Sequence, residues 1–116
     1  MDHKTVEEHI LSMPNARLDY PFGPNTAVYK VGPLAAGKMF AIIQEKSDPV
    51  RLSLKCDPML AETLRVKYET VVPGYHLNKK HWNTVLLTGQ LSFEEVKDLI
   101  RHSYELVTAR TEEPKV

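Results

Sequence analysis

A twelve-residue segment, GYHLNKKHWNTV from Gly74 to Val85, gathers an unusual number of chemically capable side chains. It contains two histidines, two lysines, a tyrosine and the only tryptophan of the chain. Such a set could hold a metal ion, supply a catalytic acid or base, or bind an anion; it could also be a turn packed around its tryptophan. Residue spacing and the flanking elements separate these four interpretations.

The histidine spacing argues against a metal site. His76 and His81 are five residues apart rather than four, and no acidic residue lies between them. Zinc needs three or four ligands, and Lys79 and Lys80, which lie beside the histidines, repel a cation. The other histidines share no spacing with this pair: His3, His9 and His102. We therefore expect no metal and no cofactor.

The motifs of catalytic sites are also missing from the sequence. Cys56 is in phase with Val50, Leu52 and Leu54 on an alternating strand, so its thiol is expected in the core, where burial makes it unreactive. The chain has no nucleophile elbow, no glycine-rich phosphate loop and no close pair of carboxylates on a turn. The sequence predicts a protein that is not an enzyme.

An anion-binding turn fits the segment best. Pro73 and Gly74 have the sequence of a type II turn, and Asn78 is a good N-cap for one helical turn up to Trp82. Lysines at positions 79 and 80 follow that cap, where the helix dipole favours acids over bases. Free amides, two lysines and a histidine would together attract an anion. The alternative is that the lysines only keep an exposed turn in water.

The same turn predicts a pattern of burial. One helical turn cannot hold itself together and needs a tertiary anchor. Trp82, with Leu77 as a lesser partner, is the large apolar group available, so both are expected to be buried. Lys79 and Lys80 should be exposed, with His81 at the boundary.

Flanking elements that must position this segment can be read from capping and periodicity. Capping boxes predict helix starts at Thr5–Glu8 and Ser92–Glu95, and Asp57 followed by Pro58 predicts a third. Strands are expected at 26–31, 38–44, 50–56 and 83–88. Residues expected on the inner sides of the last two helices are Met59, Leu60, Leu64, Phe93, Val96, Ile100 and Val107, with Leu99 and Ser103 on the flank. Short connections favour antiparallel neighbours, so the order predicts an α+β fold, an antiparallel sheet with helices packed on one face.

Composition sets limits on class and compartment. The 116 residues fit one domain, expected over 1–110 with a frayed tail at 111–116. No apolar run approaches the length of about 20 residues that spans a membrane, no signal peptide is seen, and there is a single cysteine, so we expect a cytoplasmic protein. The zero net charge hides a basic middle, because residues 24–82 carry nine basic and five acidic side chains, a balance of +4.

Five segments in order, PFGP, KMFAI, LSLKCDP, HLNKKHWNTV and SYELV, give the chain a family resemblance. Over residues 20–107 it resembles the MmcQ/YjbR family of small bacterial proteins. The resemblance implies a CyaY-like (frataxin-like) fold, described for the family as a double-wing DNA-binding motif. The family pattern carries over to Phe22, Gly23, Lys38, Asn78, Lys79, His81, Trp82 and Asn83. Iron binding, which frataxin-like proteins perform with an acidic helix, is not supported, since the first helix offers only Glu7 and Glu8.

Together these observations predict a nucleic-acid-binding protein, with duplex DNA as the expected partner and weak contacts to its backbone. The meander of strands 26–31, 38–44 and 50–56 is expected to have one apolar and one basic face. Candidate binding residues are Lys30, Lys38, Arg51, Lys55, His76, Asn78, Lys79, Lys80 and His81. The alternative is a protein-interaction or small-ligand module, because aromatic residues gather on turns: Tyr20, Phe22, Tyr75 and Trp82.

Overall fold

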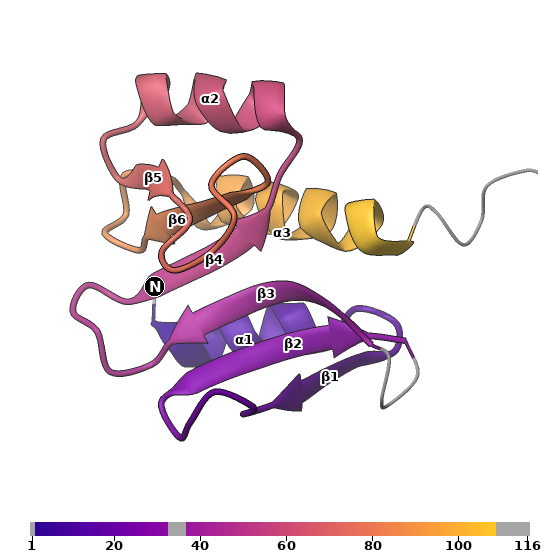
Figure 1. Cartoon of the computed structure of the whole chain (residues 1–116). Coiled ribbons are helices and arrows are strands. Elements are labelled where there is room, and N and C mark those ends of the chain that lie inside the picture. The colour runs from indigo at the N-terminus through magenta and orange to yellow at the C-terminus, as the bar shows by residue number, and fades with distance from the viewer. Residues whose placement is uncertain (1, 33–36, 109–116) are drawn as a thin grey trace, which may run out of the picture.

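One antiparallel sheet organises the protein, whose computed structural model describes residues 2–32 and 37–108. The elements run α1 (His3–Leu11), β1 (Ala16–Asp19), β2 (Thr26–Val31), β3 (Lys38–Gln44), β4 (Arg51–Lys55), α2 (Pro58–Lys67), β5 (Val71–Pro73), β6 (Trp82–Leu86) and α3 (Phe93–Thr108). All neighbouring strands are antiparallel, in the order β1-β2-β3-β4-β6-β5 (Figure 1). The expected α+β class is confirmed, while the tail at 111–116 lies outside the described residues.

The helices cover one face of the sheet. α1 and α3 lie behind the strands in Figure 1, and α2 packs beside the outer strand β5. Alternate residues of the central strands meet these helices in one hydrophobic core, whose fully buried members include Val6, Ile10, Tyr29, Phe40, Ile43, Leu52, Val96 and Ile100. We call the opposite face of the sheet the open face.

Two of the three predicted helix starts are confirmed. The carboxylate of Asp57 accepts from the amides of Met59 and Leu60, each at 3.1 Å. Ser92 and Glu95 form a reciprocal capping box: the Ser92 amide donates to the Glu95 carboxylate at 2.8 Å, and the Glu95 amide donates to the Ser92 hydroxyl at 3.1 Å.

The capping box expected at Thr5–Glu8 is wrong. Asp2 caps α1 instead, with its Oδ1 accepting from the Thr5 amide at 3.0 Å. Aspartate is as good a cap as threonine, so the helix begins about one turn earlier than expected and gains intrahelical hydrogen bonds.

Predicted burial on the helices is correct in outline but wrong in two places. Met59 is 79% exposed, and the small Ala61 is the buried residue of α2. Ser103 is fully buried rather than on the flank; its hydroxyl donates to the Phe40 carbonyl and accepts from the Lys55 amide. α3 therefore uses a serine to satisfy backbone groups of β3 and β4.

The sequence predicted that the open face is basic, but the structure shows that basic residues make up only part of it. Val28, Ile42 and Trp82 form a second buried cluster there, with Met39 and Leu77 packed against it. Ser53, which alternates with Leu52 and Leu54 and so lies on this face, is 3% exposed and shares a 2.8 Å hydrogen bond with Thr84. The expectation failed because a long connection between β5 and β6 folds back over this face (Figure 1).

Candidate nucleic-acid interface

The connection from Gly74 to His81, here the 74–81 loop, is anchored by Trp82. This tryptophan is 7% exposed and packs against Val28 and Ile42, with half-buried Leu77 beside it. The predicted core role of Trp82 is confirmed. The loop is therefore held on the open face by apolar contacts rather than by its own backbone.

The start of the loop differs from the predicted type II turn. β5 continues through Pro73, and the Gly74 amide extends the ladder by donating to the Trp82 carbonyl at 2.9 Å. A Cβ on Gly74 would lie 2.7 Å from Cβ of Trp82. Glycine is thus needed at this position for close approach to the next strand, not for a turn.

Asn78 organises the second half of the loop as its sequence suggested. Its side-chain Oδ1 accepts from the Lys80 amide at 2.9 Å, and its carbonyl accepts from the Trp82 amide at 3.0 Å. The result is a single turn. His76, before it, has a φ of +58°, which is uncommon for a residue other than glycine.

The two lysines of the loop are exposed, as predicted, but they are not equivalent. The Lys79 ammonium group donates to the Gly74 carbonyl at 2.9 Å and so closes the loop on itself. The Lys80 side chain makes no hydrogen bond or ion pair within the described part of the chain. His81 is exposed, not at the boundary as expected. Lys80 therefore carries the loop's available positive charge, with the exposed His81 imidazole next to it in the chain.

Arg65 of α2 was missed by the sequence reasoning, although it holds the end of the loop. Its guanidinium group donates to Oδ1 of Asn83 at 2.7 Å, to the carbonyl of Trp82 at 3.3 Å and to the carbonyl of Lys79. Asn83 in turn donates to the Ala61 carbonyl at 3.3 Å. No local pattern marks such a residue, because its partners lie 14 to 18 residues away.

Three predicted binding residues, Lys38, Lys55 and His81, meet around a groove of about 280 Å³. They come from the start of β3, the end of β4 and the end of the 74–81 loop. Among the described residues, the rest of the lining is formed by Cys56, Asp57, Pro58, Leu106 and Val107. We call this the basic groove. Asp57 is the acid within that described lining, and its carboxylate accepts from two amides of α2.

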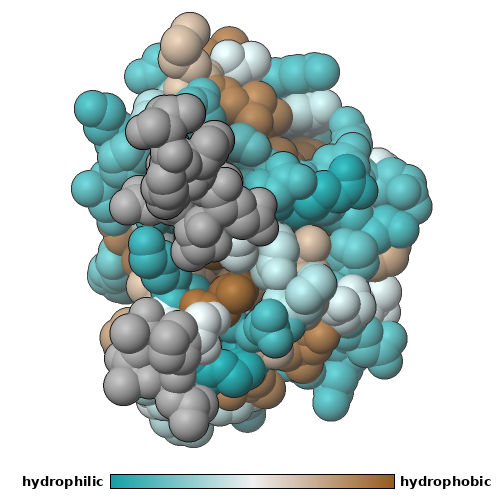
Figure 2. All heavy atoms as spheres, turned by 90° about the vertical axis from the view of Figure 1, so that its right-hand side faces the viewer, coloured by the Kyte–Doolittle hydropathy of each residue, from teal (hydrophilic) through white to brown (hydrophobic). Residues whose placement is uncertain are grey.

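The strand and helix ends that border the basic groove lie on the right of Figure 1, the side that Figure 2 shows face-on. Outside the grey atoms, hydrophilic residues predominate on this side, and the hydrophobic ones form separate areas (Figure 2). A surface of this kind suits a polar or charged ligand better than a broad apolar contact.

A second groove, of about 490 Å³, lies on the other side of the 74–81 loop. Its lining residues are Phe22, Thr26, Ile42, Gln44, Ser53, Tyr75, His76 and Leu77. We call this the aromatic groove. Ser53 and Lys55 alternate on one face of β4, so the two grooves share this strand as a border.

Arg51 and His76, both predicted binding residues, flank Tyr75, and His76 and Tyr75 line the aromatic groove. The guanidinium carbon of Arg51 lies 4.9 Å from the centre of the Tyr75 ring, a cation–π distance. The His76 ring lies 4.1 Å from the same ring. The structure therefore brings these two residues together, apart from Lys38, Lys55 and His81.

Lys30 and Tyr20 belong to neither groove. The ammonium group of Lys30 lies 3.3 Å from the Asp19 carboxylate, so its charge is partly neutralised. The Tyr20 hydroxyl donates a hydrogen bond to the Glu45 carboxylate at 2.7 Å, and this bond raises the pKa of Tyr20 to about 12. Of the four aromatic residues expected on turns, Phe22 and Tyr75 are the two that line the aromatic groove.

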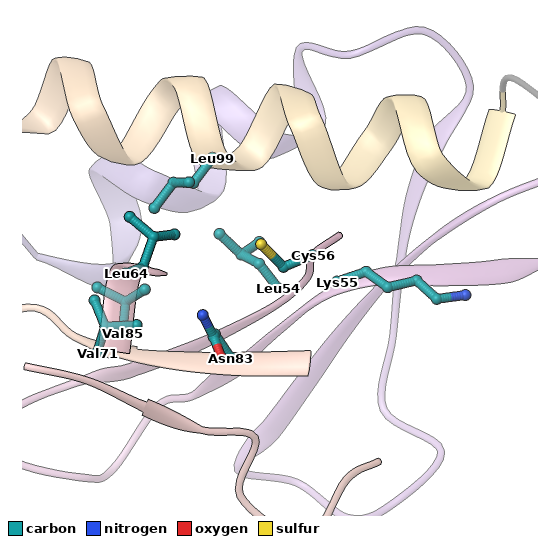
Figure 3. A pocket seen from close by; sticks show the side chains of 8 residues that line it. All are labelled: Leu54, Lys55, Cys56, Leu64, Val71, Asn83, Val85 and Leu99. Atoms are coloured by element: carbon teal, nitrogen blue, oxygen red, sulfur yellow. The ribbon is translucent and has the colours of Figure 1, made fainter. Parts of the chain in front are cut away.

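Cys56 has the structural role that its phase predicted. It is 4% exposed, and burial, with a smaller contribution from Asp57, raises the pKa of its thiol to about 11. Its sulfur lies beside a small internal cavity with Leu54, Leu64 and Leu99, whereas Lys55 extends away from it (Figure 3). A thiol in this setting is a poor nucleophile.

Within residues 2–32 and 37–108, no three side chains of the kinds that bind metals come together. Over the same residues, no helix is both long enough and apolar enough to cross a membrane.

Sequence and structure comparisons agree on the class of protein. The YjbR family model matches residues 11–106. The chain is 36% identical over 105 residues to the uncharacterised protein YbdF of Escherichia coli O157:H7, spanning 90% of this chain and 83% of that one. It is 42% identical over 67 residues to the uncharacterised protein YjbR of Escherichia coli K12, spanning 58% and 57%. The chain therefore belongs to the YjbR family.

Solved structures support the same grouping. The crystal structure of Deinococcus radiodurans DR2400, with its DUF419 domain, superposes with a TM-score of 0.90 at 40% identity, covering 95% of this chain and 80% of that one. A crystal structure of a Pseudomonas syringae protein gives a TM-score of 0.78 at 28% identity, covering 92% and 99%. The fold is thus shared with proteins of this type.

Proposed function

We propose that the protein binds nucleic acid through its open face and the adjoining ends of its strands, and is not an enzyme. The observation that carries this proposal is the basic groove, where Lys38, Lys55 and His81 converge from three separate parts of the chain. Convergent cations around a concave surface attract an anionic polymer. Lys80, on the same loop as His81, adds a further charge near the groove.

Few cations take part, so binding should be weak and sensitive to salt. Each phosphate contact contributes a slope of about −0.9 to a plot of log affinity against log salt for duplex DNA, and about −0.7 for a single strand. The proposal therefore predicts a slope that corresponds to only a few contacts. In the cell such a protein would act in the cytoplasm, where nucleic acids are present and a free thiol stays reduced.

The test is a titration of labelled DNA at low salt, followed by fluorescence anisotropy. Lys55→Ala should weaken binding and reduce the magnitude of the salt slope by about 0.9, the contribution of one phosphate contact to duplex DNA. Lys46→Ala is the matched control, because Lys46 is exposed in the turn between β3 and β4 and lines neither groove. Failure of the wild-type protein to bind either duplex or single strand would refute the proposal.

The aromatic groove favours a second candidate function, the binding of a small ligand. Its volume of about 490 Å³ lies inside the range of roughly 300–1,000 Å³ that is typical of small-molecule sites. Aromatic lining residues with the Arg51 guanidinium group beside one of them suit a planar, anionic molecule. A free mononucleotide, tested in the same titration, separates this candidate from binding to a polymer.

A further inference from the structure

We propose that the aromatic groove holds unpaired bases, so that the protein prefers single-stranded nucleic acid to duplex. This inference rests on the proposed function and names the form of nucleic acid that the open face accepts. It replaces the expectation of duplex DNA, which came from charge and family resemblance alone.

The first support is the position of Phe22. Its side chain is 63% exposed although it is large and apolar, and it lines the groove rather than joining the core. Phe22 lies in a turn that is closed by the Gly23 amide on the Tyr20 carbonyl at 3.4 Å, and Gly23 has a φ of +125°. A glycine-dependent turn thus presents a phenyl ring to the solvent beside a groove. Aromatic rings in such positions act as platforms on which bases stack.

The second support is Tyr75, another aromatic residue that lines the groove, with the positive charge of Arg51 beside it. Tyr75 is 45% exposed, and its amide donates to the Thr84 hydroxyl at 3.0 Å, which fixes the backbone at this point. Arg51 lies over the Tyr75 ring, where its guanidinium plane can stack on a base while its N–H groups reach a phosphate. A base in the groove and its neighbouring phosphate can therefore both be contacted, the base by Tyr75 and the phosphate by Arg51 beside it.

The floor of the groove adds neutral polar atoms. The Thr26 hydroxyl donates to Oε1 of half-buried Gln44 at 3.2 Å. The amide nitrogen of Gln44 makes no hydrogen bond to any of the described residues, which leaves a donor for the edge of a base.

The fold argues against duplex reading at this surface. Proteins that read duplex DNA place a helix or a two-stranded ribbon in the major groove. Here α1 and α3 pack against the other face of the sheet and contribute no residue to the aromatic groove. Bases inside a duplex are stacked on one another and cannot reach Phe22 or Tyr75, whereas bases of a single strand can.

The experiment compares a labelled single-stranded oligopyrimidine with a duplex of equal length at low salt, by fluorescence anisotropy. We expect the single strand to bind at least about tenfold more tightly. Phe22→Ala should weaken single-strand binding by about 5- to 100-fold, as for the loss of one stacking platform, and leave duplex binding unchanged. Phe22→Trp should retain binding. Met59→Ala is the matched control, since it removes another large, exposed apolar side chain, from α2 and outside both grooves.

Each other outcome has a defined meaning. Equal binding of both forms, with no effect of Phe22→Ala but a loss with Lys55→Ala, overturns this inference and leaves the proposed function standing. No binding of either form overturns both. A mononucleotide that binds as tightly as the oligonucleotide overturns the inference in favour of a small-ligand site.

Discussion

The Nε–H group of Arg65 donates to Oδ1 of Asn83 over 2.7 Å, joining the last turn of α2 to β6. Asn83 is 3% exposed, so this bond satisfies a polar atom that water does not reach. The same guanidinium group holds the carbonyls of Lys79 and Trp82, on either side of His81. A single side chain thus fixes the end of the 74–81 loop, including the part that borders the basic groove.

We expect Arg65→Ala to lower the free energy of unfolding by about 1–3 kcal/mol, because the buried Asn83 amide oxygen loses its donor. Urea denaturation followed by circular dichroism measures this. Arg101→Ala is the control: its partner Asp98 is 4.0 Å away on an exposed face of α3, so the change should be within about 0.5 kcal/mol. Equal losses in the two variants would contradict the structural role of Arg65.

Trp82→Ala should lower the free energy of unfolding by about 3–5 kcal/mol, as for other large truncations in a core. The truncation removes the indole ring that packs with Val28, Ile42 and Leu77, and so releases the 74–81 loop. Val66→Ala, at a side chain 89% exposed on α2, should leave stability nearly unchanged. A small effect of Trp82→Ala in urea denaturation would show that the loop holds without this anchor.

The two loop lysines should respond differently to truncation. Lys79→Ala removes the bond to the Gly74 carbonyl and should lower stability by about 0.5–1.5 kcal/mol. Lys80→Ala should change stability by less than about 0.5 kcal/mol, because its side chain is exposed and makes no hydrogen bond or ion pair within the described residues. Thermal or urea unfolding of the two single variants measures the difference, and identical curves would argue against the ammonium contact of Lys79.

His9 should make stability depend on pH. Burial, and then the nearby charges of Lys97 and Arg101, lower the pKa of His9 below its ordinary value of 6.5. The unfolded chain therefore binds a proton more readily than the folded one. The contribution of His9 is fully present above pH 6.5 and is lost as the pH falls below it, toward the lower folded pKa.

Urea midpoints measured from about pH 7.5 down to about pH 5 test this dependence. His9→Gln should flatten the curve in that window, because the titrating group is gone while a polar side chain of similar reach remains. Parallel curves for the wild type and the variant would assign the acid sensitivity to other groups.

The sequence predicted the parts of the fold that local signals control. Asp57 followed by Pro58, and Ser92 followed by Glu95, mark helix starts through contacts only two or three residues apart. The alternation through Leu52, Leu54 and Cys56 likewise places the thiol in the core, since side chains on a strand alternate between faces.

Long-range contacts account for what the sequence did not predict. β1 and β5 were not expected, because short strands gain their stability from pairing with β2 and β6 rather than from their own residues. The role of Arg65 depends on the packing of α2 over β6, and the aromatic groove depends on the 74–81 loop approaching Phe22 across the sheet. Residue types at Lys38, Lys55 and His81 suggested an anion site, but their meeting in one groove followed only from the fold.

The shortness of the two outermost strands has a consequence for association with other chains. An outer strand has backbone groups that can pair with a strand from another molecule. β1 has four residues, with charged Arg17 and Asp19 among them, and β5 has three and ends in Pro73, which has no amide hydrogen. The edge strands of the sheet thus offer a neighbouring molecule few backbone groups to pair with. The protein can therefore expose the aromatic side chains of its groove with little tendency to aggregate by strand pairing.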